Sequence, residues 1–125
     1  MPGSSNQDVG RAGEDAAEAL LRSENFTILH RNYRTRLGEI DIIAEEDDVL
    51  CFVEVKTRRS SATGVPTEAV TPRKQRQIAK VAAVYLDRYH PSGKDCRFDV
   101  VSVTDRRGSV AAEIVRDAFR LDDLY

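Results

Sequence analysis

The chain has 125 residues, of which 41% are hydrophobic and 32% are charged, and its formal net charge is −2. This length suits a single domain spanning residues 1–125, and the composition excludes a disordered tail and a membrane-spanning protein. Two cysteines and a polar N-terminus without a signal pattern predict a cytoplasmic protein with reduced thiols.

The first half of the chain predicts one helix followed by three strands. An Ala- and Leu-rich pattern with helical spacing indicates a helix over 8–23. Strands are expected at 26–33, 38–45 and 49–57, with a turn at 46–48 between the last two. The strand 49–57 is apolar on both faces at first, which predicts a central position in the sheet.

The second half predicts a helix and two more strands. A loop over 60–66 precedes Thr71 and Pro72, which suit the N-cap and the first position of a helix. Residues 91–93 end this helix, and strands are expected at 97–103 and 113–119. The order of elements predicts an α/β fold with a mixed central sheet flanked by helices.

Two acidic residues, Asp41 and Glu54, lie in strands that are otherwise rich in apolar residues. Strand side chains alternate, so Glu54 and Lys56 are expected to share a face with Phe52 and to leave the core at its rim. The same alternation places Asp41 on the face opposite Ile40 and Ile42. A hairpin register in which paired numbers sum to 93 would place Asp41 opposite Phe52. In that register Glu39 lies opposite Glu54, and Asp41 is the diagonal neighbour of Glu54.

Two carboxylates on such a diagonal can hold one Mg²⁺ or Mn²⁺ ion, because these cations take oxygen ligands and keep several waters. Glu39 would lie beside them. Glu14 shares a helical stripe with Gly10 and Leu21, which makes it either a third contributor or an ordinary exposed acid.

Basic residues gather in the segment 56–80 and in a second cluster formed by Arg31, Arg34 and Arg36. Segregated charge of this kind can form a basic face on an acidic protein, although a solvated surface of mixed charge is the simpler interpretation.

The sequence resembles the PD-(D/E)XK nuclease superfamily, with Asp41 at the motif Asp and Glu54-Val55-Lys56 at Glu-x-Lys. It resembles still more the YraN-like family of uncharacterised bacterial nuclease-like proteins. That resemblance is carried by segments between residues 9 and 103, which are 13–14, 31–34, 38–41, 52–58, 74–75 and 97–100. The superfamily's Pro is absent, and Ala79 stands where a Tyr is typical.

The resemblance implies a restriction-endonuclease-like fold close to that of Holliday-junction resolvases. It also implies a metal-dependent nuclease in which Asp41, Glu54 and Lys56 are catalytic. The metal ligands would be Asp41 and Glu54, completed by Glu14 and Glu39. The residues expected to contact DNA are Arg34, Arg58, Arg59, Lys74 and Gln75.

Three hypotheses follow, and the first is a Mg²⁺- or Mn²⁺-dependent DNA endonuclease that selects its substrate by structure. The second is a non-catalytic nucleic-acid-binding module with the same fold. The third, a protein-interaction domain with a charged surface, does not explain acids in the core-facing register of two strands. By analogy with branch-specific nucleases, a homodimer with two active sites is an open possibility.

Overall fold

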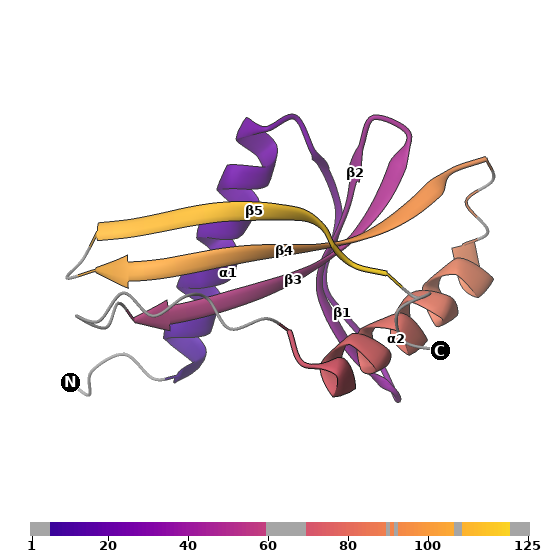
Figure 1. Cartoon of the computed structure of the whole chain (residues 1–125), viewed down its shortest axis with the longest axis horizontal. Helices are drawn as coiled ribbons and strands as arrows, with labels where there is room; N and C mark the ends of the chain where they lie inside the picture. The colour runs from indigo at the N-terminus through magenta and orange to yellow at the C-terminus, as the bar shows by residue number, and fades with distance from the viewer. Residues whose placement is uncertain (1–5, 60–69, 90, 92, 107–108, 121–125) are drawn as a thin grey trace.

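A computed structural model describes residues 6–59, 70–89, 91, 93–106 and 109–120. It contains two helices and five strands in the predicted order (Figure 1). The elements are α1 (Asn6–Ser23), β1 (Thr27–Thr35), β2 (Gly38–Glu46), β3 (Val49–Arg59), α2 (Pro72–Tyr89), β4 (Asp95–Arg106) and β5 (Ser109–Phe119). The predicted loop at 60–66 lies outside the described residues.

The five strands form one mixed sheet in the order β1-β2-β3-β4-β5. The strand β3 is central, as its sequence predicts, and pairs antiparallel with β2 and parallel with β4. Parallel neighbours need a crossover connection, and the segment between β3 and β4 contains α2. The α/β class with a mixed sheet flanked by helices is therefore confirmed, in a form consistent with a restriction-endonuclease-like fold.

The helices pack on opposite faces of the sheet, as Figure 1 shows for α1 behind β3–β5 and α2 beside β1. Beneath α2 the core contains Phe52, Ile78 and Tyr85, and beneath α1 it contains Leu21, Val53 and Val101. Alternate residues of β3 therefore enter two different cores, which is why its sequence is apolar on both faces. No helix of the described residues is long and apolar enough to cross a membrane.

The register of β2 and β3 differs from the expected one. Ile43 pairs with Phe52 and Ile42 with Val53, so the predicted pairing of Asp41 with Phe52 is wrong. A two-residue turn at Asp47 and Asp48 sets this register, in which the numbers of paired residues sum to 95 instead of the predicted 93. The ladder stops at Ile42, and continuing it by one pair places Asp41 directly opposite Glu54.

Strand β2 also changes face at Asp41. Ile40 packs in the core beneath α2, whereas Ile42 packs in the core beneath α1, so the predicted common face of these two residues is wrong. Residues 38–40 of β2, which precede Asp41, pair with β1 but not with β3. The sheet therefore forks between β2 and β3 at the position of the two acids.

Helix α2 begins as the sequence predicts. The hydroxyl of Thr71 accepts a hydrogen bond from the backbone N–H of Lys74 at 3.2 Å, which caps the helix. This start brings Lys74 over the same face of β3 that carries Phe52 and Glu54.

Candidate functional site

The fork brings the carboxyl groups of Asp41 and Glu54 together as hydrogen-bonded neighbours. Asp41 Oδ2 also accepts a hydrogen bond from the backbone N–H of Val55 at 2.8 Å. This contact satisfies a donor of β3 beyond the end of the β2–β3 ladder. Asp41 therefore has a fixed position at the fork, with its carboxylate held between two strands.

Glu54 is buried, with 7% of its surface exposed, although the sequence placed it at the rim of the core. Burial raises the pKa of its carboxyl to about 9, and the hydrogen bond and negative charge of Asp41 add to this shift. At neutral pH Glu54 is therefore largely protonated. A positive charge placed beside the two carboxyl groups would stabilise their ionised forms.

Two lysines supply part of that charge. Lys74 Nζ lies 3.7 Å from Glu54 Oε2, and the charges of Lys74 and Lys56 both oppose the upward shift of the Glu54 pKa. Lys56 is partly exposed on β3 two residues after Glu54. The structure thus gathers Asp41, Glu54, Lys56 and Lys74 from three elements around one point.

Glu14 and Glu39 form a neighbouring group around Asn32 of β1. With its nitrogen turned toward the acids, the Asn32 amide donates to Glu14 Oε1 at 3.0 Å and to Glu39 Oε1 at 2.8 Å. Arg31 also reaches Glu14, at 3.4 Å, and Arg34 reaches Glu39, at 3.2 Å. Neither acid belongs to a group of three potential ligands within the described part of the chain.

Gly13 explains how α1 comes close enough to bring Glu14 to β1. A Cβ atom at Gly13 would lie 2.1 Å from Thr57 Oγ1, well inside contact distance. The glycine therefore allows α1 to pack directly on β3, one residue before Glu14.

The residues predicted to contact nucleic acid occupy different positions. Arg34 is largely exposed on β1, and Lys74 lies beside the acidic pair. Gln75 donates its side-chain N–H to the carbonyl of Val70 at 2.7 Å, which occupies it at the start of α2. Arg58 is on β3, and the side chain of Arg59 lies outside the described residues.

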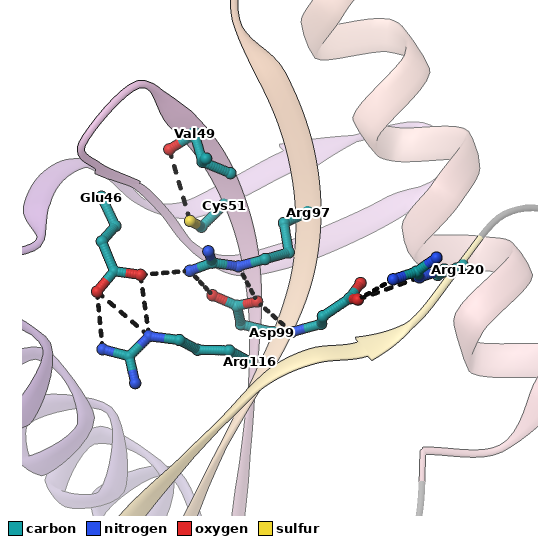
Figure 2. A network of polar contacts seen from close by, with 8 residues as sticks. Glu46, Val49, Cys51, Arg97, Asp99, Arg116 and Arg120 are labelled. Atoms are coloured by element: carbon teal, nitrogen blue, oxygen red, sulfur yellow. Dashed lines mark hydrogen bonds and ion pairs between the residues drawn. The ribbon is translucent and has the colours of Figure 1, made fainter.

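A second buried acid, Asp99 of β4, was not singled out from the sequence as a site residue. It is 0% exposed and accepts two hydrogen bonds from the Arg97 guanidinium, at 2.8 and 2.9 Å. Arg97 also donates to Glu46 at 2.7 Å, and Arg116 binds the same carboxylate (Figure 2). The only sequence signal for this network is an acid between Phe98 and Val100 of a predicted strand.

Comparison with known proteins gives a consistent result. The profile of an uncharacterised protein family, UPF0102, matches residues 13–103. A UPF0102 protein of Desulfosudis oleivorans is 50% identical over 113 residues, which are 90% of each chain. A UPF0102 protein of Symbiobacterium thermophilum is 47% identical over 112 residues, which cover 89% of this chain and 95% of the relative. The matched segment contains Asp41, Glu54, Lys56 and Lys74.

Proposed function

The chain belongs to the uncharacterised protein family UPF0102, as its resemblance to the YraN-like proteins suggests. We propose that it is a metal-dependent endonuclease that hydrolyses DNA phosphodiester bonds and selects its substrate by structure. The observation that carries this proposal is the pairing of Asp41 and Glu54 at the fork, with Lys56 and Lys74 beside them. This combination provides oxygen ligands and cations at one place.

The two carboxylates fit a hard divalent cation such as Mg²⁺ or Mn²⁺. Within the described residues no third acid joins them, which matches the preference of Mg²⁺ for one or two carboxylates plus water and phosphate oxygens. A bound cation would supply a Lewis acid and a water of lowered pKa. Glu14 and Glu39 remain the candidates for completing the ligand set, from their position at Asn32.

The lysines have separate roles in this proposal. Lys56 is placed to offset negative charge that develops on a phosphate bound at the fork, because it is partly exposed next to Glu54. Lys74, with its Nζ 3.7 Å from Glu54, would bind a phosphate next to the acidic pair. Arg58 and Arg59 follow Lys56 on β3 and are proposed to bind the phosphates of the DNA backbone.

The test combines calorimetric titration with Mn²⁺ and a nuclease assay on branched, nicked and single-stranded DNA. Asp41→Asn should abolish tight metal binding and cleavage, because an amide oxygen is an uncharged ligand, while the hydrogen bond from Val55 can persist. Lys56→Ala should abolish cleavage and leave metal binding intact. Asp48→Asn, at the exposed hairpin turn, is the matched control and should change neither.

One observation favours a second candidate, a non-catalytic nucleic-acid-binding module. Lys74 Nζ lies 3.7 Å from Glu54 Oε2, so a positive charge is already present beside the acidic pair without any metal. Binding of nucleic acid by the wild-type protein, with no cleavage of any substrate in Mg²⁺ or Mn²⁺, would select this alternative. Cleavage by Lys56→Ala at the wild-type rate would show that the activity arises elsewhere.

We also propose that the protein acts in the cytoplasm and forms a homodimer. Both cysteines are free thiols, one buried and one exposed, as expected for a reducing compartment. A dimer would supply two acidic sites for cleavage of two strands. Light scattering of the purified protein tests the dimer directly.

A further inference from the structure

Two open hollows adjoin one another between the exposed face of α2 and the turn between β1 and β2, and together they form what we call the α2 groove. The hollows have volumes of about 560 and 710 Å³ and share Leu37 at the tip of the turn. The first is lined by the basic residues Arg73, Lys74, Arg76 and Lys80, and the second by Arg34, Arg36 and Arg88. No carboxylate of the described residues lines either hollow.

Contacts between the turn and α2 fix the shape of the groove. Gln77 of α2 donates a side-chain N–H to the carbonyl of Leu37 at 3.2 Å. Gly38 has a φ of +144°, and a Cβ atom there would lie 2.7 Å from the Gln77 amide nitrogen. Glycine at position 38 therefore suits both the positive φ of the turn and its close approach to Gln77 of α2.

The α2 groove leads to the acidic pair. Lys74 lines the first hollow and also places its Nζ 3.7 Å from Glu54. Arg73, Arg76 and Lys80 extend from it along the exposed side of the same helix, without an ion pair to any described carboxylate. Cations without a carboxylate partner among the described residues are available for a polyanion.

Apolar surface lies between these cations. Leu37 is 51% exposed and Val84 is 36% exposed, and both line the second hollow together with Tyr33. A duplex presents phosphates, sugars and base edges, but the faces of its bases are stacked inside. A single strand presents both phosphates and the apolar faces of its bases, and proteins bind it with charged grooves that contain aromatic or apolar surface.

We propose that the α2 groove binds single-stranded nucleic acid, with the basic residues on its phosphates and Leu37, Val84 and Tyr33 against its bases. The strand would pass along α2 and reach the fork at Lys74. The proposed substrate is thus an unpaired segment, such as an overhang, flap or branch, rather than a continuous duplex. This inference rests on the proposed function for the identity of its ligand.

The experiment measures binding of a labelled 15-nucleotide single strand and of its duplex by fluorescence anisotropy in EDTA, where cleavage cannot occur. The wild-type protein should bind the single strand at least tenfold more tightly than the duplex. Arg76→Glu combined with Lys80→Glu should weaken single-strand binding at least tenfold and reduce the slope of log K against log salt by about 1–2. The matched control, Arg11→Glu with Arg22→Glu on the exposed side of α1, should stay within about twofold.

A third variant isolates the apolar contact. Leu37→Ser removes exposed apolar surface from the turn and leaves every charge in place, so it should reduce the preference for the single strand about threefold to tenfold. Equal binding of duplex and single strand by the wild type, or unchanged binding by Arg76→Glu/Lys80→Glu, would overturn the proposal. Competition by polyglutamate as strong as that by the oligonucleotide would also overturn it, in favour of an acidic protein partner.

The two proposals fail separately. Loss of single-strand binding in EDTA would leave the metal titration of Asp41→Asn as an intact test of the nuclease. Absence of cleavage with retained single-strand binding would remove the nuclease and keep the α2 groove.

Discussion

The described part of the sheet contains two buried acidic sites, and the acids of the two sites have different partners. Asp99 and Glu46 are bound by the guanidinium groups of Arg97 and Arg116, in the network of Figure 2. Glu54 is bound by another acid, Asp41, and at a longer distance by Lys74.

A buried carboxylate is costly unless it is paired and hydrogen-bonded, and Asp99 meets both conditions. At the fork, desolvation and a like charge oppose ionisation of Glu54. Proteins accept such conflicts mainly at functional sites, where stability is exchanged for binding or chemistry. The comparison therefore indicates a structural role for Asp99 and supports the proposal that Asp41 and Glu54 are functional residues.

The largest expected effect is on the structural side. Arg97→Met should lower the free energy of unfolding by about 3–5 kcal/mol, because it leaves Asp99 buried without its bidentate partner. Urea denaturation measures this loss, with Arg22→Met at an exposed position of α1 as the control. A loss below about 1 kcal/mol would contradict the assignment of Asp99 as an acid that depends on its pair.

The next effect is the pH dependence of the metal-free protein. The pKa of Glu54 is about 9 in the fold and near 4.5 in the unfolded chain, so the folded state binds more protons between these values. The stability from this group is complete below pH 4.5 and is lost as pH rises toward 9. Denaturation in EDTA should show a decrease on the order of 4 kcal/mol between pH 5 and pH 8.

Glu54→Gln is the control for that slope, because the amide cannot ionise and should flatten the profile over this range. The pH dependence of stability that comes from Glu46 has the opposite sign. The hydrogen bond from Arg116 lowers the pKa of Glu46, so its contribution is present above the usual carboxyl range and is lost as pH falls below it. A wild-type profile without a decrease between pH 5 and pH 8 would mean that Glu54 ionises normally.

A smaller effect separates charge from hydrogen bonding at the fork. Asp41→Asn removes the negative charge that opposes ionisation of Glu54 and can still accept from Val55, so in EDTA at pH 8 it should raise stability by about 1 kcal/mol. Asp41→Ala also removes this charge but leaves the Val55 N–H without its acceptor, which offsets the gain. Equal thermal stability of the two variants would show that the hydrogen bond contributes nothing.

The sequence predicts the order of elements, the central position of β3 and the start of α2, because alternation, apolar runs and capping are local signals. It also brings Asp41 and Glu54 together, since registers summing to 93 or 95 keep the same parity. It does not predict that Asp41 lies opposite Glu54. That arrangement depends on the two-residue turn at Asp47 and Asp48, which makes paired numbers sum to 95 instead of 93.

Sequence also misses the change of face at Asp41 and the depth at which Glu54 lies. Both result from tertiary contacts, namely the end of the β2–β3 ladder and the position of α2 over β3. The partners of Asp99 could not be identified for the same reason. Arg97 is two residues away, but Glu46 and Arg116 come from β2 and β5, and only the assembled sheet brings them together.

The smallest expected effect tests whether the Asp99 network has a centre and a periphery. Arg116 is 40% exposed and shares Glu46 with Arg97, so Arg116→Met leaves that carboxylate with a partner at 2.7 Å. The loss of stability should therefore be below about 1 kcal/mol, as for other exposed ion pairs, and should shrink further in 1 M salt. Denaturation of wild type and Arg116→Met at 0.1 M and 1 M NaCl measures both quantities. A loss close to that of Arg97→Met would mean that Arg116 belongs to the buried core of the network, and Glu46 would then depend on both guanidinium groups.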